Sequence, residues 1–161
     1  MIRTARQPSA SAQFAALLSR FPSKIVALVK RCLPKLRRSI PCTHQVVYDY
    51  ANSLVVSLGM SERGYEAIVA VAIFPDGVRL YLDKSLPDPK GLLGGSGSKV
   101  RSVTIESAAD LDNRDMKALI KAAVKHAGAT SPRSGAIQIV IKSTSTKRKP
   151  RKAAPPARSR I

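Results

Sequence analysis

Three short apolar runs, separated by residues typical of turns, limit the folds open to this chain. Residues 54–58, 67–74 and 78–82 are rich in Val, Ile and Leu, as β-strands are. Between the last two runs, Pro75, Asp76 and Gly77 have the chemistry of a tight hairpin turn. Because strands joined by short turns pair in opposite directions, the sequence predicts an antiparallel β-sheet meander.

Further strands and three helices are expected around this meander. Extended segments are predicted at residues 46–50, 100–105 and 136–141 from their β-branched or alternating apolar residues. Apolar residues recur at helical spacing over 10–21, over a second segment that begins at Pro22 or Ser23, and over 116–124. The order of elements predicts the α+β class.

The helix ends carry their own signals. Pro34 lies inside the second helical pattern, so we expect a kink there, or an end near Leu33 and a restart. Asp112 and Asp115 resemble a capping box at the start of the last helix, which Gly128 should close.

Charge is distributed unevenly along the 161 residues, whose formal net charge is +18. Every acidic residue lies between Asp49 and Asp115. Residues 1–48 hold nine basic side chains and residues 142–161 hold eight, while the middle is nearly neutral. The excess charge therefore belongs to the two ends, and it points to an anionic partner.

The C-terminal segment carries the densest group of cations: Lys147, Arg148, Lys149, Arg151 and Lys152. Large apolar residues are almost absent from this segment, so residues 142–161 are expected to be a disordered basic tail containing Pro and Ala. Such a tail would bind nucleic acid or another polyanion weakly and with strong salt dependence. It has no aromatic residue for base stacking, and a merely solubilising tail is the alternative. Residues 1–9 are expected to be flexible, which leaves 10–141 as the folded domain.

A glycine-rich loop follows the meander. It lacks the spacing of a Walker loop or of a dinucleotide fingerprint, because a strand and not a helix is expected after it. A modest anion-binding nest is the remaining hypothesis, formed by Gly94, Gly95, Gly97, Lys99 and Arg101.

Catalytic and metal chemistry have weak support. Cys32 and Cys42 form no CxxC pair and are expected to be reduced, with Cys32 packed in the core. A nucleophile would require Cys42 beside His44 or His126, with an acid such as Asp49. Three further acids, Asp110, Asp112 and Asp115, are better explained as helix caps than as metal ligands. We assign no catalytic residue, no metal and no cofactor.

The expected compartment is the cytoplasm. The chain contains no apolar stretch of 18 residues, and its early apolar run is only five residues long, so neither a membrane span nor a secretory signal is predicted. The acid-free, Arg- and Ser-containing start leaves a transit peptide as an alternative.

A family resemblance covers about residues 14–128. The motifs that carry it are residues 62–68 (ERGYEAI), 74–78 (FPDGV), 86–89 (LPDP), 95–101 (GSGSKVR) and 106–112 (ESAADLD). The chain resembles the YdhG-like domain family of unknown function. The resemblance implies an antiparallel sheet covered on one face by the N-terminal and C-terminal helices, in an arrangement compared with frataxin.

The same resemblance implies little chemistry. One branch of the family is described as an iron chaperone, and frataxins bind iron along an acidic first helix, whereas the corresponding helices here hold no acid. The leading hypothesis is therefore a non-enzymatic YdhG-like domain whose tail associates with a polyanion. The alternatives are a frataxin-like iron chaperone and a small enzyme with a site near the glycine-rich loop.

Overall fold

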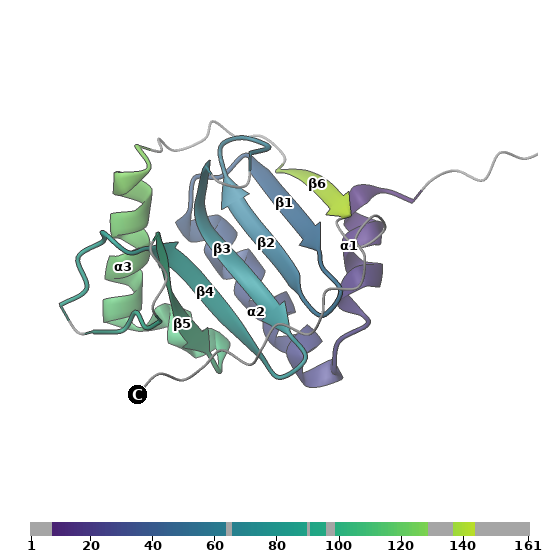
Figure 1. Cartoon of the computed structure of the whole chain (residues 1–161), viewed down its shortest axis with the longest axis horizontal. Helices are drawn as coiled ribbons and strands as arrows, with labels where there is room; N and C mark the ends of the chain where they lie inside the picture. The colour runs from purple at the N-terminus through teal and green to yellow at the C-terminus, as the bar shows by residue number, and fades with distance from the viewer. Residues whose placement is uncertain (1–7, 64–65, 90, 96–98, 129–136, 144–161) are drawn as a thin grey trace, which may run out of the picture.

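The computed structural model describes residues 8–63, 66–89, 91–95, 99–128 and 137–143. Along the chain (Figure 1) the elements are α1 (Ala10–Leu18), α2 (Ser23–Ser39), β1 (His44–Asp49), β2 (Leu54–Gly59), β3 (Ala67–Phe74), β4 (Gly77–Asp83), β5 (Val100–Ile105), the 3-10 helix η2 (Ala108–Asp112), α3 (Arg114–His126) and β6 (Gln138–Ser143). The α+β class is confirmed.

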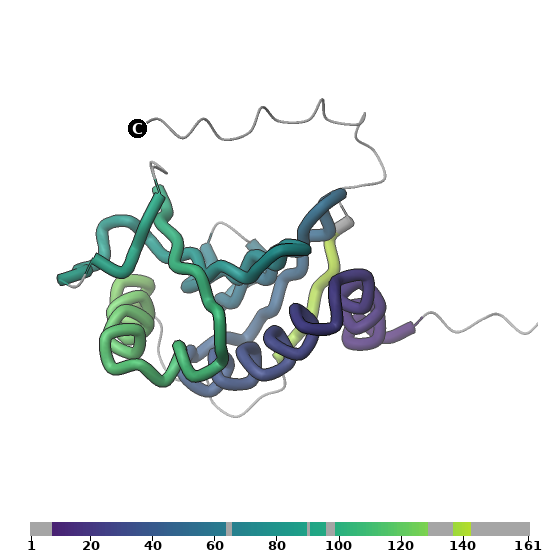
Figure 2. The backbone as a smooth tube through the Cα atoms, turned by 90° about the horizontal axis from the view of Figure 1, so that it is seen from below, coloured from purple at the N-terminus to yellow at the C-terminus, as the bar shows by residue number. Residues whose placement is uncertain are grey.

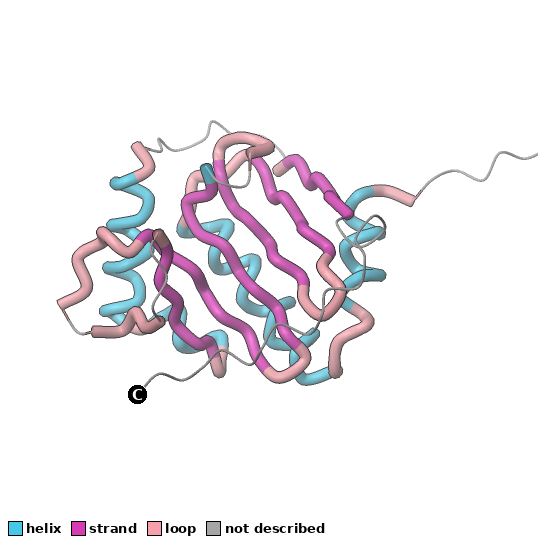
Figure 3. The backbone as a smooth tube through the Cα atoms, in the orientation of Figure 1, coloured by secondary structure: helices cyan, strands magenta, loops and turns pink. Residues whose placement is uncertain are grey.

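The sheet has the strand order β5-β4-β3-β2-β1-β6 (Figure 3). Strands β1 to β5 pair antiparallel in sequence order, which confirms the meander. The last strand differs from the expectation of an antiparallel sheet, because β6 pairs parallel to β1. Strands β5 and β6 run in the same direction at opposite edges of the sheet, and the segment with η2 and α3 forms the long crossover that this direction requires. The sheet is therefore mixed.

Helices α2 and α3 lie on one side of the sheet, and α1 lies beside β6 (Figure 2). Alternate strand residues face this helix layer because side chains of a strand point to opposite faces. The fully buried ones include Val47, Val56, Ile73 and Leu80, which belong to the same apolar cluster as Val29 of α2. This cluster is the core of the domain.

The structure decides between the two alternatives at Pro34 and corrects the end of α1. Helix α2 continues through Pro34 instead of ending near Leu33, because the ring is exposed while Leu33 and Leu36 on either side are buried in the core. Packing of these side chains outweighs the single backbone hydrogen bond that proline removes. Helix α1 ends at Leu18, and the next residues form turns with bonds from Arg20 N to Leu17 O and from Phe21 N to Leu18 O.

The start of α3 is capped by another residue than expected. Asn113 Oδ1 accepts from the backbone N–H of Asp115 at 2.8 Å and of Met116 at 3.4 Å, so the expected Asp112 and Asp115 capping box is wrong. A capping box does exist one turn earlier, between Ser107 and Asp110 at η2. Gly128 follows the end of α3 with φ +65°, a conformation that favours glycine, as predicted.

No helix within the described ranges is long and apolar enough to cross a bilayer.

Candidate anion-binding surface

The helix layer presents a basic surface built from α2 and α3. Each helix buries one apolar stripe, which includes Val29 and Leu36 in α2 and Leu119 and Ile120 in α3. Their polar faces are therefore turned to solvent. The exposed cations on them are Lys24, Lys30, Arg31, Arg38, Arg114, Lys117, Lys121 and Lys125. Since α2 contains no acid, most of this charge is uncompensated within the helix.

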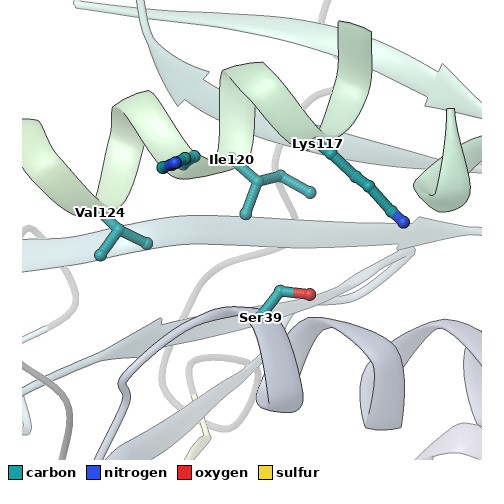
Figure 4. A pocket seen from close by; sticks show the side chains of 5 residues that line it. Ser39, Lys117, Ile120 and Val124 are labelled. Atoms are coloured by element: carbon teal, nitrogen blue, oxygen red, sulfur yellow. The ribbon is translucent and has the colours of Figure 1, made fainter. Parts of the chain in front are cut away.

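A groove separates the end of α2 from α3. It has a volume of about 280 Å³ and is lined by Ser39, Lys117, Ile120, Lys121 and Val124. Figure 4 shows Ser39 of α2 across from Lys117, Ile120 and Val124 of α3. Lys117 and Lys121 are one helical turn apart and so share a face, as do Ile120 and Val124. This volume is slightly below the range of about 300–1,000 Å³ typical of small-molecule sites.

The cations of both helices act on one acid, Asp112. Lys35 of α2 pairs with Asp112 and so joins α2 to η2. The hydrogen bond from Lys35 is the main cause of the lowered pKa of Asp112, and the charges of Lys117 and Arg38 are smaller contributions.

A second cavity, of about 330 Å³, lies at the C-terminal end of α3, over the ends of three strands. Its lining includes Tyr81, Asp83, Lys99 and His126. His126 Nε2 lies 3.7 Å from Asp83 Oδ2. Hydrogen bonds from the hydroxyl and amide of Ser85 are the main causes that lower the pKa of Asp83, with a smaller contribution from His126. Asp83 therefore stays ionised beside the imidazole at neutral pH.

Much of the predicted tail site lies outside the described residues, including Lys147, Arg148, Lys149, Arg151 and Lys152. Its proposed binding role stays a prediction. Flexibility was expected of residues 1–9 and a disordered tail of residues 142–161, and most of both ranges also lies outside the described residues. Where the structure describes them, the expected bounds are wrong: Ser9 caps the start of α1, and Lys142 and Ser143 belong to β6, where they pair with Tyr48 and Asp49 of β1.

The glycine-rich loop uses several of its polar groups internally. Gly94 exchanges backbone hydrogen bonds with Ser102, at 2.7 and 3.0 Å, and the Arg101 guanidinium donates to the carbonyl of Gly95. Lys99 is exposed, and Gly97 lies outside the described ranges. The anion nest stays a prediction, with the Gly94 amide already engaged.

The two thiols are buried and unpaired by disulfide. Burial raises the pKa of Cys32 to about 11, helped by the Asp110 carboxylate and opposed by Lys35. Burial also raises the pKa of Cys42. His44 Nδ1 lies 2.8 Å from the hydroxyl of Thr43, and His126 faces Asp83. Nothing in these contacts activates Cys42 as a nucleophile.

The acids considered as metal ligands have separate structural roles. Asp110 Oδ2 accepts from the amides of Glu106 and Ser107, at 2.8 and 3.0 Å, while Asp112 pairs with Lys35. Within the described ranges there is no group of three or more His, Cys, Asp or Glu residues that could hold a metal ion.

Sequence reasoning missed the partners of α2. Ser39 lines the groove, and the side chains of Arg37 and Gln45 are joined across α2 and β1. The one local signal was the Lys117, Ile120, Lys121 and Val124 pattern on α3. Comparisons with protein-family models, with curated proteins and with solved structures gave no match, so the resemblance to the YdhG-like family rests on the sequence motifs alone.

Proposed function

We propose that this protein is a non-enzymatic domain that associates weakly with nucleic acid through two basic regions, the α2–α3 surface and the tail at residues 147–152. The observation that carries the proposal is the row of exposed cations on α2, a helix without an acid, together with Lys117 and Lys121 of α3, which line the groove. A row of cations of this kind neutralises successive phosphates and releases their counterions. The expected binding is salt-dependent and independent of base sequence.

The fold that we propose is more specific than the α+β class, which is what the structure shows. A YdhG-like, frataxin-like arrangement is supported by the order of two helices, meander, glycine loop, strand and helix. A cytoplasmic location is supported by two cysteines that remain free.

The test is fluorescence anisotropy with a labelled 20-base-pair duplex at increasing salt. The K117Q/K121Q variant removes two cations from the groove, and R63Q/K84Q removes two exposed cations that lie outside α2 and α3. We expect K117Q/K121Q to weaken binding about tenfold at low salt and to reduce the salt slope by about 2, since each lost phosphate contact changes it by about 0.9. The matched R63Q/K84Q variant should change both by much less.

Two results would overturn the proposal. One is the absence of duplex binding by the full chain at 50 mM salt; the other is binding that does not respond to salt. A variant that ends at Ser143 separates the regions, because the helix layer should still bind without the tail.

The second cavity favours one alternative, a small enzyme. Asp83 lies 3.7 Å from His126, which places a carboxylate near a histidine, the pairing that a histidine base uses. Hydrolysis of p-nitrophenyl acetate that disappears in H126A and persists in K121A would support it. Equal rates in both variants would exclude His126 as the base. The iron chaperone alternative is not supported by any group of metal-binding side chains among the described residues.

A further inference from the structure

Strands β3 and β4 separate at one end of the sheet. From their turn they pair only as far as Ala70 and Tyr81, so residues 67–69 of β3 and 82–83 of β4 have no partner in the opposite strand. Over the same stretch β3 stays paired with β2, and β4 stays paired with β5. The sheet is therefore split between two inner strands, and we call this opening the β3–β4 split.

A β-bulge in β3 accounts for the split. Leu58 of β2 pairs with Val69, but the next residue, Gly59, pairs with Ala67, which leaves Ile68 as an extra residue in β3. Gly59 permits this close approach, because a Cβ at its position would lie only 3.2 Å from the Cα of Ala67. A bulge bends its strand and increases the local twist, so β3 stops following β4 here. Bulges that end strand pairing are over-represented next to active sites.

The second cavity, of about 330 Å³, lies in this split. It is lined by both separated strands, by the start of β5 and by the last turn of α3. Its inner wall is apolar and buried, and includes Val69, Leu82 and Ala123. Its rim is open to solvent, since Ala127 is exposed and the side chain of Val100 is 45% exposed. The cavity therefore joins an apolar floor to an accessible entrance, and its volume is within the range of about 300–1,000 Å³ typical of small-molecule sites.

Charged groups of both signs lie at the rim. The Asp83 side chain is 46% exposed, and Ser85 donates hydrogen bonds from its hydroxyl and its amide to Oδ1. Within the described ranges Oδ2 accepts no hydrogen bond, because His126 Nε2 is 3.7 Å away. Lys99 is exposed, and none of the ion pairs among the described residues involves its ammonium group. The rim thus offers a carboxylate oxygen to a cation and an ammonium group to an anion.

This distribution of charge selects one class of small molecule. Asp83 would repel a simple carboxylate, and Lys99 would repel a simple amine. The rim also lies at the C-terminal end of α3, where the helix dipole favours positive charge on a ligand. A molecule that carries an ammonium group, a carboxylate and an apolar side chain matches Asp83, Lys99 and the apolar floor together. An apolar α-amino acid is such a molecule.

We propose that the β3–β4 split binds a small apolar α-amino acid, with its ammonium group on Asp83, its carboxylate on Lys99 and its side chain on the buried floor. The inference goes beyond the proposed function, because it uses neither the α2–α3 surface nor the tail. It assigns no reaction to His126. Nucleic acid binding and amino acid binding are therefore independent properties of this chain.

The test uses amide NMR spectra of the full, ¹⁵N-labelled chain with L-leucine as the probe. We expect L-leucine to shift the amide signals of residues around the cavity, such as Val69, Lys99 and Ala127, and to raise the thermal midpoint. Three analogues each lack one group: isocaproate lacks the ammonium group, isoamylamine lacks the carboxylate and glycine lacks the apolar side chain. Each should bind about tenfold more weakly than L-leucine, the scale of one lost charged hydrogen bond.

Two charge-removing variants test the polar contacts. D83N keeps an oxygen for Ser85 but removes the negative charge, and D76N removes an exposed acid from the β3–β4 turn as its matched control. We expect D83N to weaken L-leucine binding about tenfold without weakening isocaproate binding, since the repulsion of the carboxylate is also lost. K99Q should weaken L-leucine binding to a similar degree, while D76N should bind as the wild type does.

An alanine pair on α3 tests the cavity itself. Ala127 lines the entrance and is exposed, so A127L narrows the entrance without overpacking the core. Ala118 is an exposed alanine of α3 outside the cavity, and A118L is the matched control. We expect A127L to weaken L-leucine binding about tenfold and A118L to leave it unchanged. Thermal midpoints of both variants show that each remains folded.

The contrary outcomes are specific. If neither L-leucine nor L-valine shifts the amides around the cavity at concentrations up to about 10 mM, the inference falls. If isocaproate binds the wild type as tightly as L-leucine does, or if D83N binds L-leucine as the wild type does, the site does not recognise an amino acid. Equal binding by A127L and A118L places the ligand elsewhere and also overturns the inference. None of these results bears on duplex binding, which the K117Q/K121Q experiment tests separately.

Discussion

Arg37 of α2 donates hydrogen bonds from both Nε and Nη2 to the side-chain oxygen of Gln45 in β1, the first at 2.9 Å. Gln45 is fully buried, and its Nε2 has no hydrogen-bond partner. Burial lowers the pKa of Arg37, yet none of the ion pairs of the described chain involves its guanidinium. A half-buried cation thus has a neutral acceptor and lies next to an unsatisfied donor.

This arrangement predicts that Gln45→Glu stabilises the protein. The substitution replaces the unsatisfied N–H₂ with an oxygen and gives Arg37 an ionised partner of the same shape. We expect the free energy of unfolding to rise by about 1 kcal/mol at pH 7. Gln45→Leu removes the acceptor and should lower it by about 1–2 kcal/mol. Urea denaturation of the three proteins gives the ranking, and a Q45E protein less stable than Q45L would contradict it.

The Arg20 and Asp49 pair is the second contact between an arginine and a polar β1 side chain on the core side. Arg20 Nη2 lies 2.6 Å from Asp49 Oδ1, and the Asp49 side chain is only 9% exposed. We expect Arg20→Gln to cost about 1–2 kcal/mol, because a largely buried carboxylate loses a charged donor.

An exposed pair in the same protein supplies the control. Arg63 and Glu66 are 3.6 Å apart, with 67% and 45% of their side chains exposed. Arg63→Gln should cost less than about 0.5 kcal/mol, since solvent screens exposed pairs. Thermal or urea unfolding compares the variants, and equal losses in R20Q and R63Q would show that burial of Asp49 does not matter.

Stability should fall in alkaline solution because of Cys32. Its folded-state pKa of about 11 exceeds the ordinary value of 9.0, mainly through burial. Below pH 9 the thiol is protonated in both states, and its contribution is fully present. As the pH rises from about 9 to 11, the unfolded chain releases this proton and the folded chain holds it, so the free energy of unfolding declines.

Urea unfolding at pH 8, 9, 10 and 11 measures this decline. The C32A variant should decline less over the same range, because it lacks the titrating group, and the slopes rather than the absolute values are compared. At pH 8 both thiols should also react slowly with a thiol-specific reagent until the protein unfolds. Identical slopes in wild type and C32A would refute the assignment.

The cap of α3 provides a further test. Asn113 satisfies the amides of Asp115 and Met116 at the helix start. Asn113→Ala should cost about 1 kcal/mol, and Asn113→Asp should be nearly neutral, because aspartate is an equally good cap. Asp112→Ala is the comparison at the neighbouring position: it loses the exposed ion pair with Lys35 and should cost clearly less than Asn113→Ala, because solvent screens that pair and Asp112 makes no cap bond to α3. A loss in D112A as large as that in N113A would indicate that the sequence-based cap assignment is the correct one.

Local patterns in the sequence determined the elements that depend on near neighbours. The Val and Ile runs with their Pro-Asp-Gly turn specified the meander, and the apolar spacing of α2 and α3 specified amphipathic helices, because periodicity and turn chemistry act over a few residues. Charge segregation was also visible, and with it the basic character of α2. The sequence did not decide whether α2 continues through Pro34, since this depends on the buried neighbours Leu33 and Leu36.

Tertiary structure decided everything that joins distant segments. The crossover through η2 and α3 inserts β6 parallel to β1, which brings Lys142 over Tyr48, ninety-four positions earlier in the chain. The same packing puts Ser39 opposite Lys117 and Arg37 over Gln45. No local pattern carries these pairings, because they follow from which faces of the helices and sheet bury the most apolar surface together.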